Sequence, residues 1–242
     1  MRDRTRHKER FLGHSPVPIE PGRTALLIVD VQYLDAHPDY GLARMAKERG
    51  QFEVWGHFFE TLPGVVKNIQ SLQRAFRRVG MEVIFVKIQS YTQDGRDFSP
   101  SYREKGVVAP PGSKEAEILE ELAPLPNEVV LTKLSTSAFT SSPLDTVLRY
   151  MGIDSLVVTG VVTNYCVETT ARDAYDRGYR VALVGDACAG IVPEHHEMAL
   201  EALDGVLCKV MRTEEVLAVL PQAAVRPLEG SASNETAPHA AS

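Results

Sequence analysis

The sequence predicts an α/β fold, a three-layer α-β-α sandwich around a mostly parallel, doubly wound sheet of six strands. Two observations lead to this prediction. Short apolar segments rich in β-branched residues alternate along the chain with amphipathic segments, which is the order expected of strands joined by helices. The apolar segments are hydrophobic at consecutive positions rather than at every second one, which is typical of strands that helices cover on both faces.

Six segments have the strand pattern. In chain order they are Thr24 to Val31, Glu82 to Ile88, Glu128 to Thr132, Ser155 to Val162, Tyr179 to Val184 and Gly205 to Met211. Because parallel strands carry their functional residues beyond their carboxyl ends, the residues that follow each segment are the ones to examine.

The segments between the strands predict helices. Residues 63–79 place their apolar side chains on one face, and Gly80 follows as a stop signal. Ser142 and Pro143 have the composition of an N-cap and a first helical residue for a helix that runs to Tyr150. Further helices are expected over 168–175, 193–203 and 213–220. Helices in these places imply right-handed crossovers between the strands.

The composition predicts one globular domain, residues 23–222, in a chain of 242. A basic N-terminal arm (1–22) precedes it, and a Gly-, Ser- and Ala-rich tail (223–242) with the composition of a disordered segment follows. The net charge of -6 argues against nucleic-acid binding. The sequence has neither a signal-peptide pattern nor an apolar run of membrane-spanning length, and its three cysteines are odd in number without a CxxC pair. We therefore expect a cytoplasmic protein with reduced thiols.

Three predicted strand ends carry reactive side chains. Asp30 ends the first strand, Lys133 follows the third, and Cys166 lies in the turn after the fourth. A lysine ammonium and a helix N-terminus both favour a thiolate, and a carboxylate can accept the thiol proton. Each residue also has an ordinary explanation, as a capping aspartate, a solvated lysine or a buried thiol. The residue types alone leave both interpretations open.

Three motifs add a family resemblance. The segment GVVTNYCVETTARDAYDRGYRVALVGDACAG, which contains Cys166, strongly resembles the signature of the isochorismatase-like cysteine hydrolases. TALLIVDVQ resembles the first motif of that family, and EVVLTKLSTSAFTSSPLDTVLRYMGID resembles its lysine motif and the helix that follows. The resemblance extends over roughly residues 23 to 220, in the order that the family has.

The resemblance implies a Cys-Asp-Lys triad and the isochorismatase-like hydrolase fold. In this triad Cys166 is the nucleophile, Asp30 shuttles protons, and Lys133 orients Asp30 and stabilises the thiolate. The resemblance also implies a cis peptide bond between Val161 and Val162, with the N–H groups of Val162 and Cys166 forming an oxyanion hole. Members of this family are usually homo-oligomers, so a dimer or tetramer is expected.

Departures from the family pattern narrow the expected chemistry. Nicotinamidases of this family bind a metal through an Asp and two His, whereas here the second strand runs into Gln89 and Ser90 without a histidine. No metal and no cofactor are therefore expected. Members that cleave the vinyl ether of isochorismate commonly replace the cysteine, so Cys166 favours an amidase. Cys188 and Cys208 are expected in the core. In the adjacent pair His195 and His196, one side chain is expected to point inward.

These observations predict a metal-independent cysteine amidohydrolase. It would cleave the C–N bond of a small linear amide, with carbamoyl and ureido compounds preferred, through a cysteine thioester and with release of ammonia. The alternatives are an isochorismatase-type vinyl-ether hydrolase and a catalytically silent binding or assembly member of the fold. The expected partner is a small-molecule substrate, with neither nucleic acid nor membrane.

Substrate contacts are predicted from polar residues near the strand ends and from aromatic residues of the long segment 36–60. That segment is interpreted either as a lid over the pocket or as an ordinary surface insertion. The predicted contact residues are Gln32, Tyr40, Trp55, Gln89, Ser90, Ser137, Thr163 and Asn164.

Overall fold

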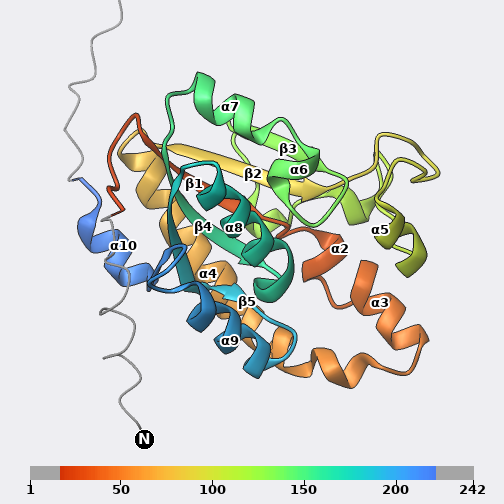
Figure 1. Ribbon diagram of the computed structural model, residues 1–242. Coiled ribbons are helices and arrows are strands. Elements are labelled where there is room, and N and C mark those ends of the chain that lie inside the picture. Colours follow the sequence, from red (N-terminus) through yellow and green to blue (C-terminus); the bar gives the residue numbers. More distant parts are fainter. Residues whose placement is uncertain (1–16, 222–242) are drawn as a thin grey trace, which may run out of the picture.

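The computed structural model describes residues 17–221 and has a six-stranded sheet in which every ladder is parallel (Figure 1). The strand order is β3-β2-β1-β4-β5-β6, so the winding direction reverses between β1 and β4. The strands are β1 (Thr24–Val29), β2 (Glu82–Ile88), β3 (Val129–Lys133), β4 (Ser155–Val161), β5 (Arg180–Ala189) and β6 (Lys209–Met211). The predicted α/β, doubly wound architecture is confirmed.

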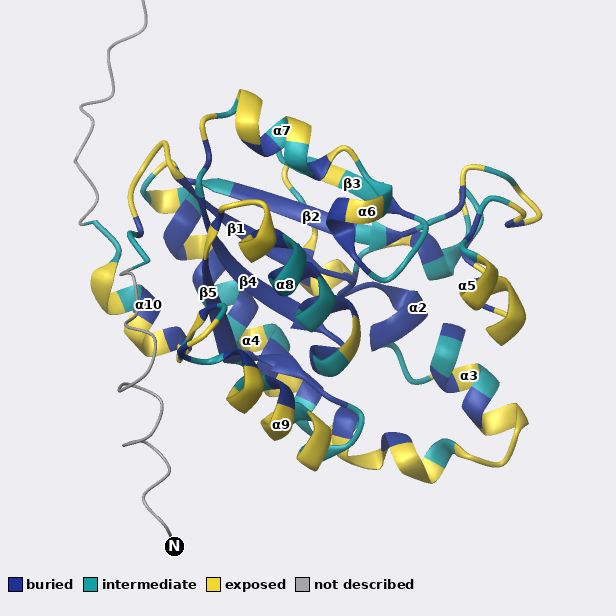
Figure 2. Ribbon diagram, in the orientation of Figure 1, coloured by how far each residue is buried: buried dark blue, intermediate teal, exposed yellow. Residues whose placement is uncertain are grey.

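Helices cover both faces of the sheet. Side chains of β1 alternate between two hydrophobic clusters, with Leu27 in one and Leu26 in the other. The Leu26 cluster is completed by α4 (Gly56–Arg78) and α10 (Thr213–Val219). The Leu27 cluster is completed by α6 (Ala138–Ser141), α7 (Leu144–Tyr150), α8 (Glu168–Asp176) and the end of α9 (Pro193–Leu203). Figure 2 shows strands β1, β2, β4 and β5 almost entirely buried between these layers, as the consecutive apolar positions predicted, whereas the edge strands β3 and β6 are partly exposed.

Some predicted boundaries were wrong because tertiary packing outweighed local signals. The predicted helix start at residue 63 is instead a Pro63 inside α4, since the helix begins at Gly56 and buries Phe58 and Leu62. Strand β5 continues to Ala189 rather than Val184, because a register shift lets Cys188 pair with Gly160 of β4. Strand β6 is shorter than predicted, because residues 205–208 form a turn closed by a bond from the N–H of Gly205 to the carbonyl of Cys208.

The shorter helices gather at the carboxyl end of the sheet. They are α2 (Tyr33–Ala36), α3 (Gly41–Glu48) and α5 (Pro100–Lys105), with 3-10 turns at Phe52–Trp55, Lys114–Ala116 and Glu120–Leu122. The segment 36–60 is therefore mostly helical, and its last part, from Gly56, belongs to α4.

The termini fall only partly inside the described range. Of the predicted arm, residues 17–22 are described, and Ile19 packs into the same cluster as Leu26. Residues 1–16 and the predicted tail, 223–242, lie outside the described residues. Between residues 17 and 221, no helix has the length and apolar character needed to cross a membrane.

Candidate active site

Three strand ends bring Asp30, Lys133 and Cys166 together at the carboxyl edge of the sheet. The ammonium Nζ of Lys133 lies 2.9 Å from Oδ2 of Asp30, and both side chains are fully buried. The same nitrogen donates to Sγ of Cys166 over 3.3 Å, and Cys166 is only 6% exposed. The lysine therefore bridges the carboxylate and the sulfur.

The backbone at Asp30 is fixed by its neighbouring strands. Asp30 has a φ of 54°, in the left-handed region, which costs a non-glycine residue roughly 1–2 kcal/mol and which Asp adopts more readily than most residues. Its N–H donates to the carbonyl of Val86 over 2.8 Å. On the other side, Gly160 has a φ of 120°, and a Cβ there would collide with the backbone of Val29. The glycine thus allows β4 to approach β1 beside Asp30.

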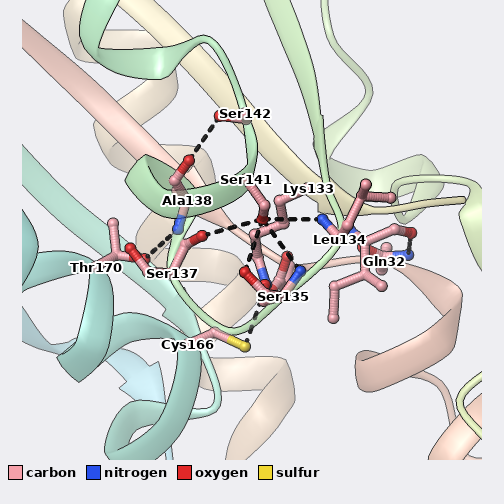
Figure 3. Close-up of polar contacts among 12 residues, drawn as sticks. Gln32, Lys133, Leu134, Ser135, Ser137, Ala138, Ser141, Ser142, Cys166 and Thr170 are labelled. Atoms are coloured by element: carbon pink, nitrogen blue, oxygen red, sulfur yellow. Dashed lines mark hydrogen bonds and ion pairs between the residues drawn. The ribbon is translucent and has the colours of Figure 1, made fainter. Parts of the chain in front are cut away.

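The loop after β3 also contacts the ammonium group of Lys133. Nζ of Lys133 also donates to the carbonyl of Ser135 over 2.9 Å. The hydroxyl of Ser141 accepts from the N–H groups of Leu134 and Ser135 at 3.0 and 3.1 Å, which curls the loop around the lysine (Figure 3). Burial by itself would lower the pKa of Lys133, but its neighbours raise the pKa, and the charge of the Asp30 carboxylate contributes most to that rise. The lysine therefore stays protonated.

Cys166 lies in one turn of π-helix, Thr163–Val167, that continues into α8. The peptide bond between Val161 and Val162 is cis, at the position that the family resemblance implies. Burial raises the pKa of the Cys166 thiol, and the attraction of Lys133 opposes this without overcoming it. The sulfur is therefore a protonated thiol at rest, so burial outweighs the lysine and the helix N-terminus that were expected from the sequence to favour a thiolate.

Asp30 is placed to accept the thiol proton. Burial raises the pKa of its carboxyl group, while Lys133 and the Cys166 thiol lower it. Apart from the ion pair with Lys133, neither carboxylate oxygen accepts a hydrogen bond of ordinary geometry from residues 17–221. A proton from the thiol thus has an unoccupied acceptor beside it.

A cavity of about 270 Å³ opens beside Cys166. Its apolar walls come from helices, loops and the end of β2, and they are formed by Leu34, Leu42, Ile88, Val107, Val162 and Ile191. Its polar lining, besides the cysteine, consists of Asp35, Tyr102, Lys105, Thr136 and Tyr165. Val162 and Cys166, the two predicted oxyanion donors, both face this space, so a carbonyl carbon bound there would be within reach of the sulfur.

Sequence reasoning missed all five of these polar lining residues, and two of them, Tyr102 and Asp35, are buried. Tyr102 on α5 places its hydroxyl 3.6 Å from Sγ of Cys166. Burial raises the pKa of Tyr102, so the phenol stays neutral. Ser99 and Pro100 form the N-cap and first residue of α5, a start signal that could have located the helix but not the strand end against which it packs. Asp35 is the second of these buried residues, with one carboxyl oxygen buried and unpartnered among the described residues.

None of the eight predicted substrate contacts lines this cavity. Gln32 is committed to the backbone, since its amide donates to the carbonyls of Ile88 and Glu115 and accepts from the N–H of Ile88. Tyr40 packs edge-on against Tyr33, and Trp55 packs against phenylalanines of α4. These three side chains are therefore engaged in structural contacts rather than in the cavity lining.

The remaining predicted contacts are also engaged elsewhere or lie outside the cavity. Ser90 donates to the carbonyls of Thr92 and Ala109. Ser137 caps α6 and donates to the Asp173 carboxylate. The hydroxyl of Thr163 and Nδ1 of His196 lie 2.8 Å apart. Gln89 and Asn164 are partly exposed.

Other groups with possible chemistry have structural roles. Within residues 17–221, no three His, Cys, Asp or Glu side chains are grouped so that they could hold a metal ion. His37 stacks on Tyr33. His195 is exposed while His196 points inward, as predicted. Cys188 and Cys208 are buried core thiols, which confirms their predicted place.

Comparison with known proteins gives consistent matches. A family model described as the isochorismatase domain matches residues 24–215. A cysteine hydrolase from Pseudomonas syringae pv. phaseolicola 1448A superposes with a TM-score of 0.70 at 28% identity, covering 85% of this chain and 97% of the other. An isochorismatase family protein from Desulfovibrio vulgaris has a TM-score of 0.65 at 30% identity, covering 81% and 98%. An N-carbamoylsarcosine amidase from Thermoplasma acidophilum has a TM-score of 0.60 at 28% identity, covering 79% and 97%.

Proposed function

The chain belongs to the isochorismatase family, and from this premise we propose that it is a metal-independent cysteine amidohydrolase that cleaves a C–N bond of a small linear amide. One observation carries the proposal: the ammonium of Lys133 bridges the Asp30 carboxylate at 2.9 Å and the Cys166 sulfur at 3.3 Å. A thiol with a base and a fixed cation beside it can act as the nucleophile of an acyl-transfer reaction.

The first half of the reaction forms a thioester. Cys166 transfers its proton to Asp30 as its sulfur bonds to the substrate carbonyl carbon. The carbonyl oxygen becomes an oxyanion that accepts hydrogen bonds from the N–H groups of Val162 and Cys166. Asp30 then gives its proton to the amine nitrogen, the C–N bond breaks and ammonia leaves. Lys133 stays protonated throughout and keeps the carboxylate oriented.

The second half regenerates the enzyme. Water enters the place left by ammonia and gives a proton to Asp30 as its oxygen bonds to the thioester carbon. The C–S bond then breaks, and the proton returns from Asp30 to the sulfur. The product is the acid or carbamate of the substrate, and Asp30 acts as base and acid in turn.

The cavity supports a small substrate of carbamoyl or ureido type. Its volume of about 270 Å³ lies near the lower end of small-molecule sites, which begin at about 300 Å³. Its walls are mostly apolar, with few polar groups close to the sulfur. A compact, uncharged carbonyl group fits these surroundings better than a large or highly charged one. The similarity to an N-carbamoylsarcosine amidase also supports this substrate class.

Ammonia release from a panel of ureido acids, biuret relatives and simple amides tests the proposal. The wild type and Cys166→Ser are compared, each with and without a chelator. We expect activity on at least one carbamoyl or ureido compound, lost in the mutant and unaffected by the chelator.

Other outcomes would redirect the assignment. Activity that survives Cys166→Ser would move the chemistry to Asp30 and favour hydrolysis of a vinyl ether. Sensitivity to the chelator would reject the metal-independent mechanism. No ammonia from any compound would reject the substrate class.

A further inference from the structure

Asp35 is a buried acid that the proposed reaction does not use. It lies in α2, shortly after Asp30, and its side chain lines the same cavity as Cys166. It is only 5% exposed, and its Oδ2 has no hydrogen-bond partner among residues 17–221. Leaving such a group unsatisfied is unfavourable, so a ligand in the cavity is the natural partner.

Burial and the neighbouring charge of Asp30 both favour the uncharged form of Asp35. Burial raises the pKa of its carboxyl group well above the ordinary value, and the charge of Asp30 raises it further. Lys133 opposes this, but that ammonium already pairs with Asp30. The charge of Asp35 would in turn raise the pKa of the Cys166 thiol and of the Tyr102 phenol, both of which are raised by burial as well. The cavity lining also carries one cationic side chain, that of the exposed Lys105. In its uncharged form Asp35 presents a hydroxyl donor and a carbonyl acceptor.

A donor and an acceptor on one carboxylic acid match a particular ligand chemistry. A primary amide or carbamoyl group has a carbonyl acceptor and an N–H donor in the same spacing and can pair with the acid through two hydrogen bonds. A carboxylate has acceptors only, and it would add a negative charge near Asp30 in a mostly apolar cavity whose one lining cation, Lys105, is exposed to solvent.

We propose that Asp35 is a specificity-determining residue that binds the uncharged carbamoyl or primary-amide group of the substrate and disfavours a carboxylate at that place. The inference rests on the proposed function for the class of reaction. It goes beyond that function by naming the residue that recognises the substrate and the chemical group that this residue binds.

Two alkylating agents of nearly the same shape test this without any turnover. Iodoacetamide carries a primary amide and iodoacetate a carboxylate, so the ratio of their rates at Cys166 measures the preference. The rates are taken from the Cys166 peptide by mass spectrometry, and each is divided by its rate with glutathione at the same pH. The wild type is compared with Asp35→Asn, Asp35→Leu and Asp39→Asn, the last being the same change at an exposed carboxylate paired with Lys47.

We expect the corrected ratio of amide to carboxylate to be about tenfold or more in the wild type, the size that one or two hydrogen bonds confer. It should stay within about threefold of that value in Asp35→Asn, because asparagine keeps an uncharged donor and acceptor. Asp35→Leu should bring the ratio close to that of the free thiol. Asp39→Asn should match the wild type.

Several outcomes would overturn the assignment. If Asp35→Asn behaves as Asp35→Leu does, or differs from the wild type by tenfold, Asp35 acts as a charged carboxylate. If Asp35→Leu keeps the wild-type ratio, the residue is only structural. Should Asp35→Leu fail to fold, the comparison of Asp35→Asn with the wild type still decides between a neutral and a charged acid.

The same experiment separates this inference from the proposed function. A preserved amide preference together with no ammonia release from any compound would overturn the reaction and leave the recognition role in place. Cys166 reacting no faster than Cys188 and Cys208 in the wild type would overturn both.

Discussion

The reactive centre and the cavity beside it are built from different parts of the fold. Asp30 and Lys133 stand at the ends of β1 and β3, and Cys166 lies in the turn that follows β4, so ladders of backbone hydrogen bonds fix the strands that carry all three residues. Much of the cavity wall comes instead from α2, α3, α5 and the connecting loops. The sheet therefore determines which chemistry is possible, while the surrounding helices determine which molecule reaches it. The two regions should respond differently to mutation.

The largest expected effect is on turnover when a strand-end group is changed. Asp30→Asn keeps the shape of the side chain but removes the base, and a general acid–base group contributes about 10²–10⁴-fold to rate. We therefore expect kcat to fall by about a thousandfold, with KM little changed. Leu42→Ala, at the cavity wall, should mainly raise KM. Steady-state kinetics on the best panel substrate measure both. A large fall in kcat from the wall variant would contradict the division between the two regions.

The second expected effect is on the free energy of unfolding, which depends on the burial of the charged side chains of Asp30 and Lys133. Lys133→Met leaves the fully buried Asp30 carboxylate without its partner, and breaking a buried ion pair in this way costs about 3–5 kcal/mol. Denaturant unfolding should show this loss near neutral pH. Lys47→Met removes the exposed lysine that pairs with Asp39, and it should unfold close to the wild type because surface ion pairs contribute little. Equal losses in the two variants would contradict the buried, charged centre.

The difference between the regions also explains what could be predicted from the sequence. Asp30, Lys133 and Cys166 follow apolar runs whose ends are visible in the sequence, and parallel strands bring their carboxyl ends to one edge. Gln32 was predicted to contact substrate because it adjoins Asp30, yet its amide satisfies the backbone of Ile88.

The cavity walls depend on contacts between distant segments. Tyr102 meets Cys166 only because α5 packs over the strand ends, and no local pattern in the chain specifies that packing. Likewise, Pro63 has the composition of a helix start, but the burial of Phe58 and Leu62 extends α4 beyond it. Local signals therefore locate elements well, but tertiary packing decides where they begin and what they touch.

The third prediction tests the charge state of Asp35 through stability. Its folded-state pKa is raised above the unfolded value of about 3.9, so the unfolded chain releases a proton that the folded chain keeps. This contribution to stability is fully present below the unfolded value and is lost as pH rises toward the folded one. Asp35→Asn removes this dependence of the unfolding free energy on pH. The unfolding free energy of the variant relative to the wild type should therefore rise with pH, by up to about 1.4 kcal/mol per pH unit.

Unfolding free energies of the wild type and Asp35→Asn, measured from pH 4 to 8, give this slope. Asp39→Asn is the control, since its exposed carboxyl group has a lowered pKa beside Lys47, and it should show no gain that grows with pH. A constant difference between Asp35→Asn and the wild type at every pH would mean that Asp35 is ionised in the fold.

The smallest expected effect belongs to Tyr102, which lies on a wall helix but touches the strand-end sulfur. Tyr102→Phe removes one hydroxyl, 3.6 Å from Sγ of Cys166, and leaves the ring in place. A neutral hydrogen bond contributes about 0.5–1.5 kcal/mol, so kcat/KM should fall by about tenfold or less. Because the raised pKa of the phenol keeps it neutral, the alkaline limb of the pH–rate profile should not move. A loss of kcat/KM as large as that of Asp30→Asn, or a shift of the alkaline limb, would place Tyr102 among the proton-transfer groups. Either result would contradict the division of roles between the reactive centre and the cavity wall.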